Sequence, residues 1–118
     1  MIPTLDTLQE FDTHTGLAYA DGDEELYREV LAMFHEQLTD TFSHLPEKLR
    51  EGSDATLARQ VHTLKGSAGS VGATRIEAVA REIDQCLKAG MSPDDELMQA
   101  LQVSIQAAKD DLLPALEH

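Results

Sequence analysis

The chain has no tryptophan, a single cysteine and few aromatic residues, which make up 4 % of its 118 residues. With one cysteine, Cys86, a disulfide within the chain is excluded, and we interpret this residue as a small core side chain. A core with so few aromatic residues is built from Leu, Ala, Val, Ile and Met, which favours helices over strands. The length suits one domain and leaves no room for a nucleotide-binding domain beside it.

Positive charge is also scarce, because nine Lys and Arg residues are outnumbered by 22 Asp and Glu residues, for a net charge of −13 at pH 7. Nucleic-acid phosphates repel such a chain, so we expect no nucleic-acid partner. No apolar run reaches the length of a membrane span, and the N-terminus lacks a basic segment followed by an apolar one. We therefore expect a soluble, cytoplasmic domain without membrane insertion.

Helix signals dominate, and no segment shows the alternation of a strand. Apolar residues recur at helical spacing from Leu26 to Leu49, after an N-cap at Asp23. Pro46 lies inside this pattern, and because the period continues past it we expect a kinked helix rather than two helices. Before it we expect a short extra helix whose apolar side is formed by Leu5, Leu8 and Phe11.

Three more helices are expected downstream, separated by short turns. The first is capped by Asp54 and ends within 69–72, and the second ends at Gly90. The last has Ser92 as its N-cap and Pro93 as its first residue. Because short turns join antiparallel neighbours, the predicted fold class is all-α, an up-and-down antiparallel four-helix bundle with a short extra N-terminal helix.

One helix breaks the local rules. Within 57–68 the apolar side chains form one stripe that must face the core, and His62 points about 130° away from its centre. Lys65, Gly66 and Gly69 lie within about 60° of His62 around the helix. Each glycine costs a helix about 1 kcal/mol relative to alanine. Backbone without side chains beside an outward histidine therefore indicates that another molecule must approach the imidazole closely.

The chemistry of phosphoryl transfer fits this face. A neutral imidazole is a competent nucleophile near neutral pH. In phosphoryl transfer the protein mainly positions the reacting groups and stabilises the negative charge of the transition state. We predict that His62 is the phosphoacceptor, that Lys65 stabilises the phosphoryl group, and that Gly66 leaves room for the phosphodonor.

The charge distribution favours an acidic partner at the same place. Residues 53–90 hold five basic and four acidic residues, a net of +1, so the rest of the chain carries −14. We predict partner contacts at four positions of this region: Arg59, Gly69, Ser70 and Arg75.

The run from His62 to Gly69, followed by Gly72 and Ala73, resembles the motif around the phosphorylated histidine of the histidine-containing phosphotransfer (HPt) domain family. The stretch from Phe11 to Tyr27 resembles the family's N-terminal portion. The resemblance implies a four-helix bundle with an exposed phosphohistidine in mid-helix. Some members carry a glutamine at the position where Asp84 falls here, and the role of Asp84 stays open.

The resemblance also implies a phosphoryl carrier with no ATP site or catalytic machinery of its own. His62 would accept a phosphoryl group from a receiver aspartate and pass it to another receiver. The implied partners are receiver domains of response regulators or of a hybrid histidine kinase, with Mg²⁺ on the receiver and no cofactor or metal on this chain. We expect a monomer, either separate or as the cytoplasmic domain of a membrane-bound hybrid kinase. Residues 1–115 are assigned to the HPt domain, and 116–118 are interpreted as a remnant of an expression tag.

Other helical bundles match less well. A metal-binding bundle would carry Glu-x-x-His pairs on facing helices, a pattern that this sequence lacks. A kinase would need a glycine-rich phosphate loop. An adaptor bundle in which His62 is incidental is compatible with the composition, but it gives no reason for glycines beside the histidine. Three further histidines have no comparable neighbours and are interpreted as surface or packing residues: His14, His35 and His44.

Overall fold

The computed structural model describes residues 5–116, except for the side chain of Asp6, and these residues form helices and turns without a strand. The helices are η1 (Leu5–Thr7, a 3-10 helix), α1 (Thr13–Tyr19), α2 (Glu24–Thr39), α3 (Leu45–Glu51), α4 (Ala55–Val71), α5 (Thr74–Lys88) and α6 (Asp95–Leu116). The all-α prediction is confirmed for this part of the chain. Of the tag remnant expected at 116–118, residues 117 and 118 lie outside the described residues, whereas Leu116 ends α6.

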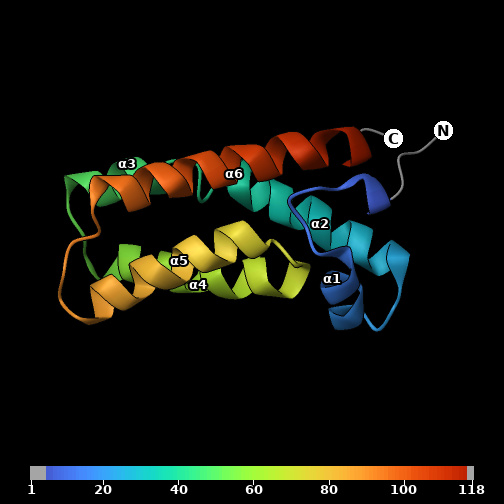
Figure 1. Ribbon diagram of the computed structural model, residues 1–118, viewed down its shortest axis with the longest axis horizontal. Helices are drawn as coiled ribbons and strands as arrows, with labels where there is room; N and C mark the ends of the chain where they lie inside the picture. Colours follow the sequence, from blue (N-terminus) through green and yellow to red (C-terminus); the bar gives the residue numbers. More distant parts are fainter. Residues whose placement is uncertain (1–4, 117–118) are drawn as a thin grey trace.

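The four long helices, α2, α4, α5 and α6, surround one core. Consecutive long helices run in opposite directions along a body of 46 × 24 × 20 Å (Figure 1). α4 packs along α5, α5 along α6, α6 along α2, and α2 against α4. α3 packs against both α6 and α4. Within residues 5–116, no helix is both long and apolar enough to cross a membrane.

Pro46 marks the start of a separate helix, so the predicted kink is wrong. α2 ends at Thr39, and Pro46 lies in the first turn of α3. Proline lacks a backbone N–H and its ring clashes with the carbonyl four residues earlier, and neither matters in a first turn. The apolar spacing continues through the break because Phe42, in the non-helical turn between the two helices, is buried in the core, and so is Leu45, the first residue of α3.

The N-terminal segment forms two short helices where one was expected. Its apolar residues are buried as predicted: Leu5, Leu8 and Phe11. Only Leu5–Thr7 is helical in this part, because Asp111 of α6 accepts the backbone N–H groups of Gln9 and Glu10 at 2.9 and 2.8 Å. These contacts end η1 after one turn, and α1 begins as a separate helix after its own N-cap, Asp12.

Aspartates cap three of the long helices. Asp23 and Asp54 accept the backbone N–H three residues later, at 3.1 and 2.8 Å, as predicted. α6 is capped by Asp94, which accepts the Leu97 N–H at 2.8 Å, so the cap predicted at Ser92 is wrong. A carboxylate both accepts this hydrogen bond and interacts favourably with the helix dipole, which explains why the helix starts later than the serine and proline indicated.

Candidate functional site

Helix α4 turns its apolar side chains into the core and His62 away from it. The predicted stripe is buried: Leu57, Val61, Leu64 and Ala68. The side chain of His62 is 61 % exposed. Its place in the middle of a 17-residue helix fixes the backbone on both sides, so the imidazole is presented to other molecules on a rigid element.

Asp84 of α5 reaches His62 across the pair of helices. Its oxygen Oδ2 lies 3.6 Å from His62 Nδ1, 2.8 Å from Lys65 Nζ and 3.0 Å from Lys88 Nζ. The Asp84 side chain is 5 % exposed, and a carboxylate so buried is stable only when it is paired. His62 therefore lies beside an assembled cluster of one anion and two cations.

The cluster keeps Asp84 ionised. The hydrogen bond from Lys65 lowers the pKa of the Asp84 carboxyl to about 2; burial acts in the opposite direction, and the hydrogen bond from Lys88 adds to the lowering. The folded-state pKa is thus below the ordinary value of 3.8. For a depressed carboxyl pKa the stabilisation is complete above the unfolded-state value and disappears as the pH falls through the folded-state value. Asp84 should therefore stabilise the fold above about pH 4 and lose this effect towards pH 2.

We expect Asp84→Asn to be destabilised at pH 5 and to lose much of this disadvantage in acid. The difference in free energy of unfolding between the parent and the variant should shrink by about 1 kcal/mol between pH 5 and pH 3, out of a total of about 2 kcal/mol. Urea denaturation followed by circular dichroism measures it. Glu82→Gln, which removes an exposed carboxylate from the same helix, controls for net charge. A difference for Asp84→Asn that is the same at both pH values would contradict the pairing.

An open cavity of about 380 Å³ lies between α4 and α5 beside the histidine. Its lining residues are Ala58, Arg59, His62, Asp84, Leu87 and Lys88. The lining combines an exposed nucleophile with apolar side chains and the cations Arg59 and Lys88. Within the described residues, no group of three or more His, Cys, Asp and Glu side chains is arranged to hold a metal ion. The cavity is suited to an anionic group brought by a partner.

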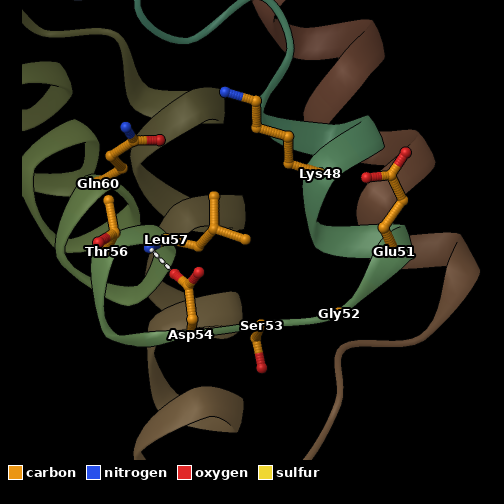
Figure 2. Close-up of a pocket in the computed structure, with 8 residues that line it drawn as sticks. All are labelled: Lys48, Glu51, Gly52, Ser53, Asp54, Thr56, Leu57 and Gln60. Carbon is orange, nitrogen blue, oxygen red and sulfur yellow. Dashed lines mark hydrogen bonds between the residues drawn. The ribbon is translucent and has the colours of Figure 1, made fainter.

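A second hollow, of about 470 Å³, lies between the end of α3 and the start of α4. Figure 2 shows its lining, in which Lys48 and Glu51 of α3 and Gln60 of α4 do not converge on a common point. The one hydrogen bond drawn there is the N-cap of α4, from Leu57 N–H to Asp54. This hollow contains none of the predicted site residues, so the candidate site is the one at His62.

The three glycines of the motif have different surroundings. A β-carbon built at Gly66 meets no atom within 4 Å, so this side of α4 is open. At Gly69 it would lie 2.6 Å from Oε2 of Glu77 on α5. At Gly72, where φ is +82°, it would clash with the backbone carbonyl of Asp12. Backbone conformation and packing therefore account for the absent side chain at Gly72. At Gly69 the close atom is the end of a flexible side chain that can move aside, and at Gly66 there is no close atom, so packing does not explain these two glycines.

The structure brings one of the other predicted contact residues to the site. Arg59 is exposed and lines the cavity of His62. Ser70 donates a hydrogen bond to the carbonyl three residues earlier, at 3.0 Å. Arg75 forms an ion pair with Glu10, at 3.4 Å. Both are thus engaged within the domain, away from the cluster around Asp84.

Lys88 was missed at the level of sequence. The family resemblance gave Asp84 the position of a glutamine in some members, but its contacts were not predicted. The spacing of four residues between Asp84 and Lys88 is the usual one for an ion pair on a helix surface. That spacing does not indicate that the pair faces His62, because the rotation and register of α5 against α4 are set by packing. The hydrogen bond from Lys65 to Asp84 joins residues 19 positions apart in the chain.

The sequence model of the Hpt domain family matches residues 29–111, well over half of the chain. The chain belongs to the Hpt domain family. No curated protein and no solved structure matches it. The matched range contains the whole cluster around His62, so the candidate site lies inside the family domain. The whole N-terminal stretch that resembles the family, Phe11 to Tyr27, lies before the matched residues.

HPt domains are phosphocarrier modules of phosphorelays, not catalysts, and their partners are receiver domains. The chain is therefore a histidine phosphotransfer module. An HPt domain needs one accessible histidine and a surface that admits a receiver, and the described residues offer such a histidine in the middle of α4.

Proposed function

We propose that this HPt domain carries a phosphoryl group on His62, which it accepts from the aspartate of one receiver domain and passes to another. The observation that carries the proposal is the exposed imidazole in the middle of α4. Asp84 lies beside this imidazole and pairs with the ammonium groups of Lys65 and Lys88, so two cations are held close to the ring. In each transfer a ring nitrogen bonds to phosphorus while the bond from phosphorus to the aspartate oxygen breaks, or the reverse. The receiver brings its aspartate and Mg²⁺.

The proposal is tested by incubating the domain with a panel of receivers phosphorylated with ³²P. At least one receiver is expected to lose its label to the domain, in a form that acid removes and base does not, as for a phosphohistidine. A domain that takes label from no receiver of a broad panel, and none from a small phosphodonor, would contradict the proposal. An adaptor bundle would bind a partner without taking the label.

Lys65 is proposed to stabilise the phosphoryl group. It lies one turn after His62, and its ammonium group is already held at 2.8 Å by Asp84, with the side chain 23 % exposed. An ammonium group has three N–H donors, so Lys65 can donate to a phosphoryl oxygen while it stays paired with Asp84, and such charge-assisted hydrogen bonds are among the strong ones.

Lys65→Ala should therefore slow transfer by tenfold or more, on the order of 1 to 3 kcal/mol. Rapid-quench measurement of label transfer from one phosphorylated receiver checks this. Lys48→Ala is the matched control, because it removes an exposed lysine of α3 at the other hollow. Equal rates for Lys65→Ala and Lys48→Ala would remove Lys65 from the site.

The receiver is proposed to dock over α4 and α5. Gly66 admits its aspartyl phosphate, and four residues are proposed as contacts: Arg59, Gly69, Ser70 and Arg75. The exposed Arg59 beside His62 supports the first of these most directly. The net charge of +1 over 53–90, in a chain of −13, supports an acidic docking face on the receiver.

The finer description of the module is part of the same proposal. We propose an up-and-down antiparallel four-helix bundle, supported by the alternating directions of the long helices and their closed ring of contacts (Figure 1). The domain spans residues 1–115 and acts as a monomer in the cytoplasm, alone or as part of a hybrid kinase. Size-exclusion chromatography with light scattering tests the monomer.

A further inference from the structure

We propose that Arg81 of α5 is a docking residue for the receiver, and that Glu77 is the positioning residue that holds its guanidinium over α4 in the space left by Gly69. The inference rests on the proposed function of His62 and deepens it, because it names a group that recognises an acidic side chain of the receiver. Arg81 is not among the residues that line the cavity of His62, so its effect is on binding and not on the chemical step.

One carboxylate oxygen connects the two helices. Oε2 of Glu77 accepts a hydrogen bond from a terminal nitrogen of Arg81 at 3.2 Å. The same oxygen lies 2.6 Å from the point where a β-carbon at Gly69 would stand. The carboxylate therefore occupies the space that the missing side chain leaves on α4, and it draws the guanidinium toward that helix. A methyl group at this position would push the carboxylate away and release the arginine.

The register of the two helices places Arg81 at the edge of the proposed docking surface. α4 and α5 pack side by side (Figure 1). Lys65 pairs with Asp84, and Gly69 faces Glu77. The α5 residues 77–84 therefore run antiparallel to the α4 residues 65–69, and position 81 lies alongside the open position 66. The Arg81 side chain, which is 55 % exposed, thus borders the surface where the aspartyl phosphate of the receiver is proposed to dock.

The glycine distinguishes this ion pair from an ordinary one. An exposed pair four residues apart on one helix is common and contributes little to stability. Glycine is a poor helix former, and packing does not require it here, because the end of Glu77 could move aside for a methyl group. Gly69 instead keeps the carboxylate against α4. Such an arrangement is useful where the place of the Arg81 guanidinium matters.

The chemistry of the pair indicates a partner that carries a carboxylate. A guanidinium has five N–H donors in a fixed fork. Glu77 engages one terminal nitrogen, and among the side chains that the structure describes no second acidic group forms an ion pair with Arg81. The remaining donors can bind a carboxylate of the receiver. Residues 53–90 carry a net charge of +1 in a chain of −13, so an acidic group is attracted to this surface and repelled by the rest of the chain.

The experiment measures the affinity of the domain for an unphosphorylated receiver that exchanges label with it, by isothermal titration calorimetry. Arg81→Ala should raise the Kd about five- to tenfold at low salt, and less at high salt because screening weakens the contact. Glu77→Ala should raise the Kd about threefold or more, although it keeps the arginine. Simple removal of a negative charge would strengthen binding to an acidic partner, so a weakening is specific to positioning.

Gly69→Ala separates positioning from obstruction. The variant should weaken binding about as much as Glu77→Ala and melt at the same or a higher temperature, since alanine is the better helix former. If the methyl group acts by displacing Glu77, it has no further effect once Arg81 is gone. Gly69→Ala combined with Arg81→Ala should then bind like Arg81→Ala alone. Weakening by the methyl group in both backgrounds would mean that it obstructs the receiver directly, which would contradict the inference.

Glu82→Ala is the matched control, because it removes an exposed carboxylate from the same helix and should bind the receiver as tightly as the parent or more tightly. Parent affinity in Arg81→Ala, or a higher affinity in Glu77→Ala, would overturn the inference.

A spectroscopic measurement tests the positioning without a receiver. In ¹⁵N-labelled protein, the Nε–H resonance of Arg81 in Gly69→Ala should move toward its position in Glu77→Ala. A resonance that stays at its parent position in Gly69→Ala would overturn the role of the glycine. Failure of every receiver to exchange label with the domain would instead contradict the proposed function, and this resonance would still show whether Gly69 holds the arginine through Glu77.

Discussion

Replacing His62 by glutamine is expected to abolish phosphoryl uptake and leave the helix content unchanged. Glutamine has similar reach but no nucleophilic nitrogen, so no covalent intermediate can form. The side chain is 61 % exposed and points away from the core, so the substitution removes no buried packing. Label transfer from a phosphorylated receiver and far-ultraviolet circular dichroism measure the two halves of this prediction.

A second histidine provides the control. His44→Gln changes an exposed residue at the start of α3 whose side chain makes no cap hydrogen bond, and it should transfer at the parent rate. Acid-labile, base-stable phosphate on the His62→Gln variant would show that another residue is the acceptor. Loss of helix content in that variant would show that His62 also supports the fold.

Gly66→Gln is expected to slow transfer on the order of a hundredfold while the protein melts at the same or a higher temperature. A β-carbon at Gly66 meets open space, so a better helix former should stabilise α4 by up to about 1 kcal/mol. The same side chain would stand about 40° around the helix from His62, where it obstructs the aspartyl phosphate of a docked receiver. Stability and transfer are thus predicted to change in opposite directions.

Two other substitutions make this result interpretable. Gly66→Ala should transfer at an intermediate rate, since its methyl group intrudes least. Gly72→Ala should be plainly destabilised, because it combines a positive φ with a clash against the backbone of Asp12. A folded Gly66→Gln protein that transfers at the parent rate would contradict the proposed docking geometry. If it melted as low as Gly72→Ala, the glycine would instead serve packing.

The sequence alone determined the helical class, most of the caps and the place of His62. These follow from local interactions: the spacing of apolar residues sets which face of α4 is buried, and a short polar side chain before a helix accepts its free N–H groups. His62 and its exposed neighbour Gly66 lie on one helix, so their relation depends on the helical period alone. The same local patterns were misleading at Pro46, because buried side chains continue through a turn that is not helical.

Only the tertiary structure decided what surrounds the histidine. The rotation and register of α5 against α4 place Asp84 within 3.6 Å of His62 and bring Lys88 to the same oxygen. They also separate Gly66, which is open, from Gly69, which faces Glu77. Helical periodicity gives the direction of each side chain on its own helix but not the partner that it meets. That partner is chosen by the packing of the whole core, to which side chains distant in sequence contribute together.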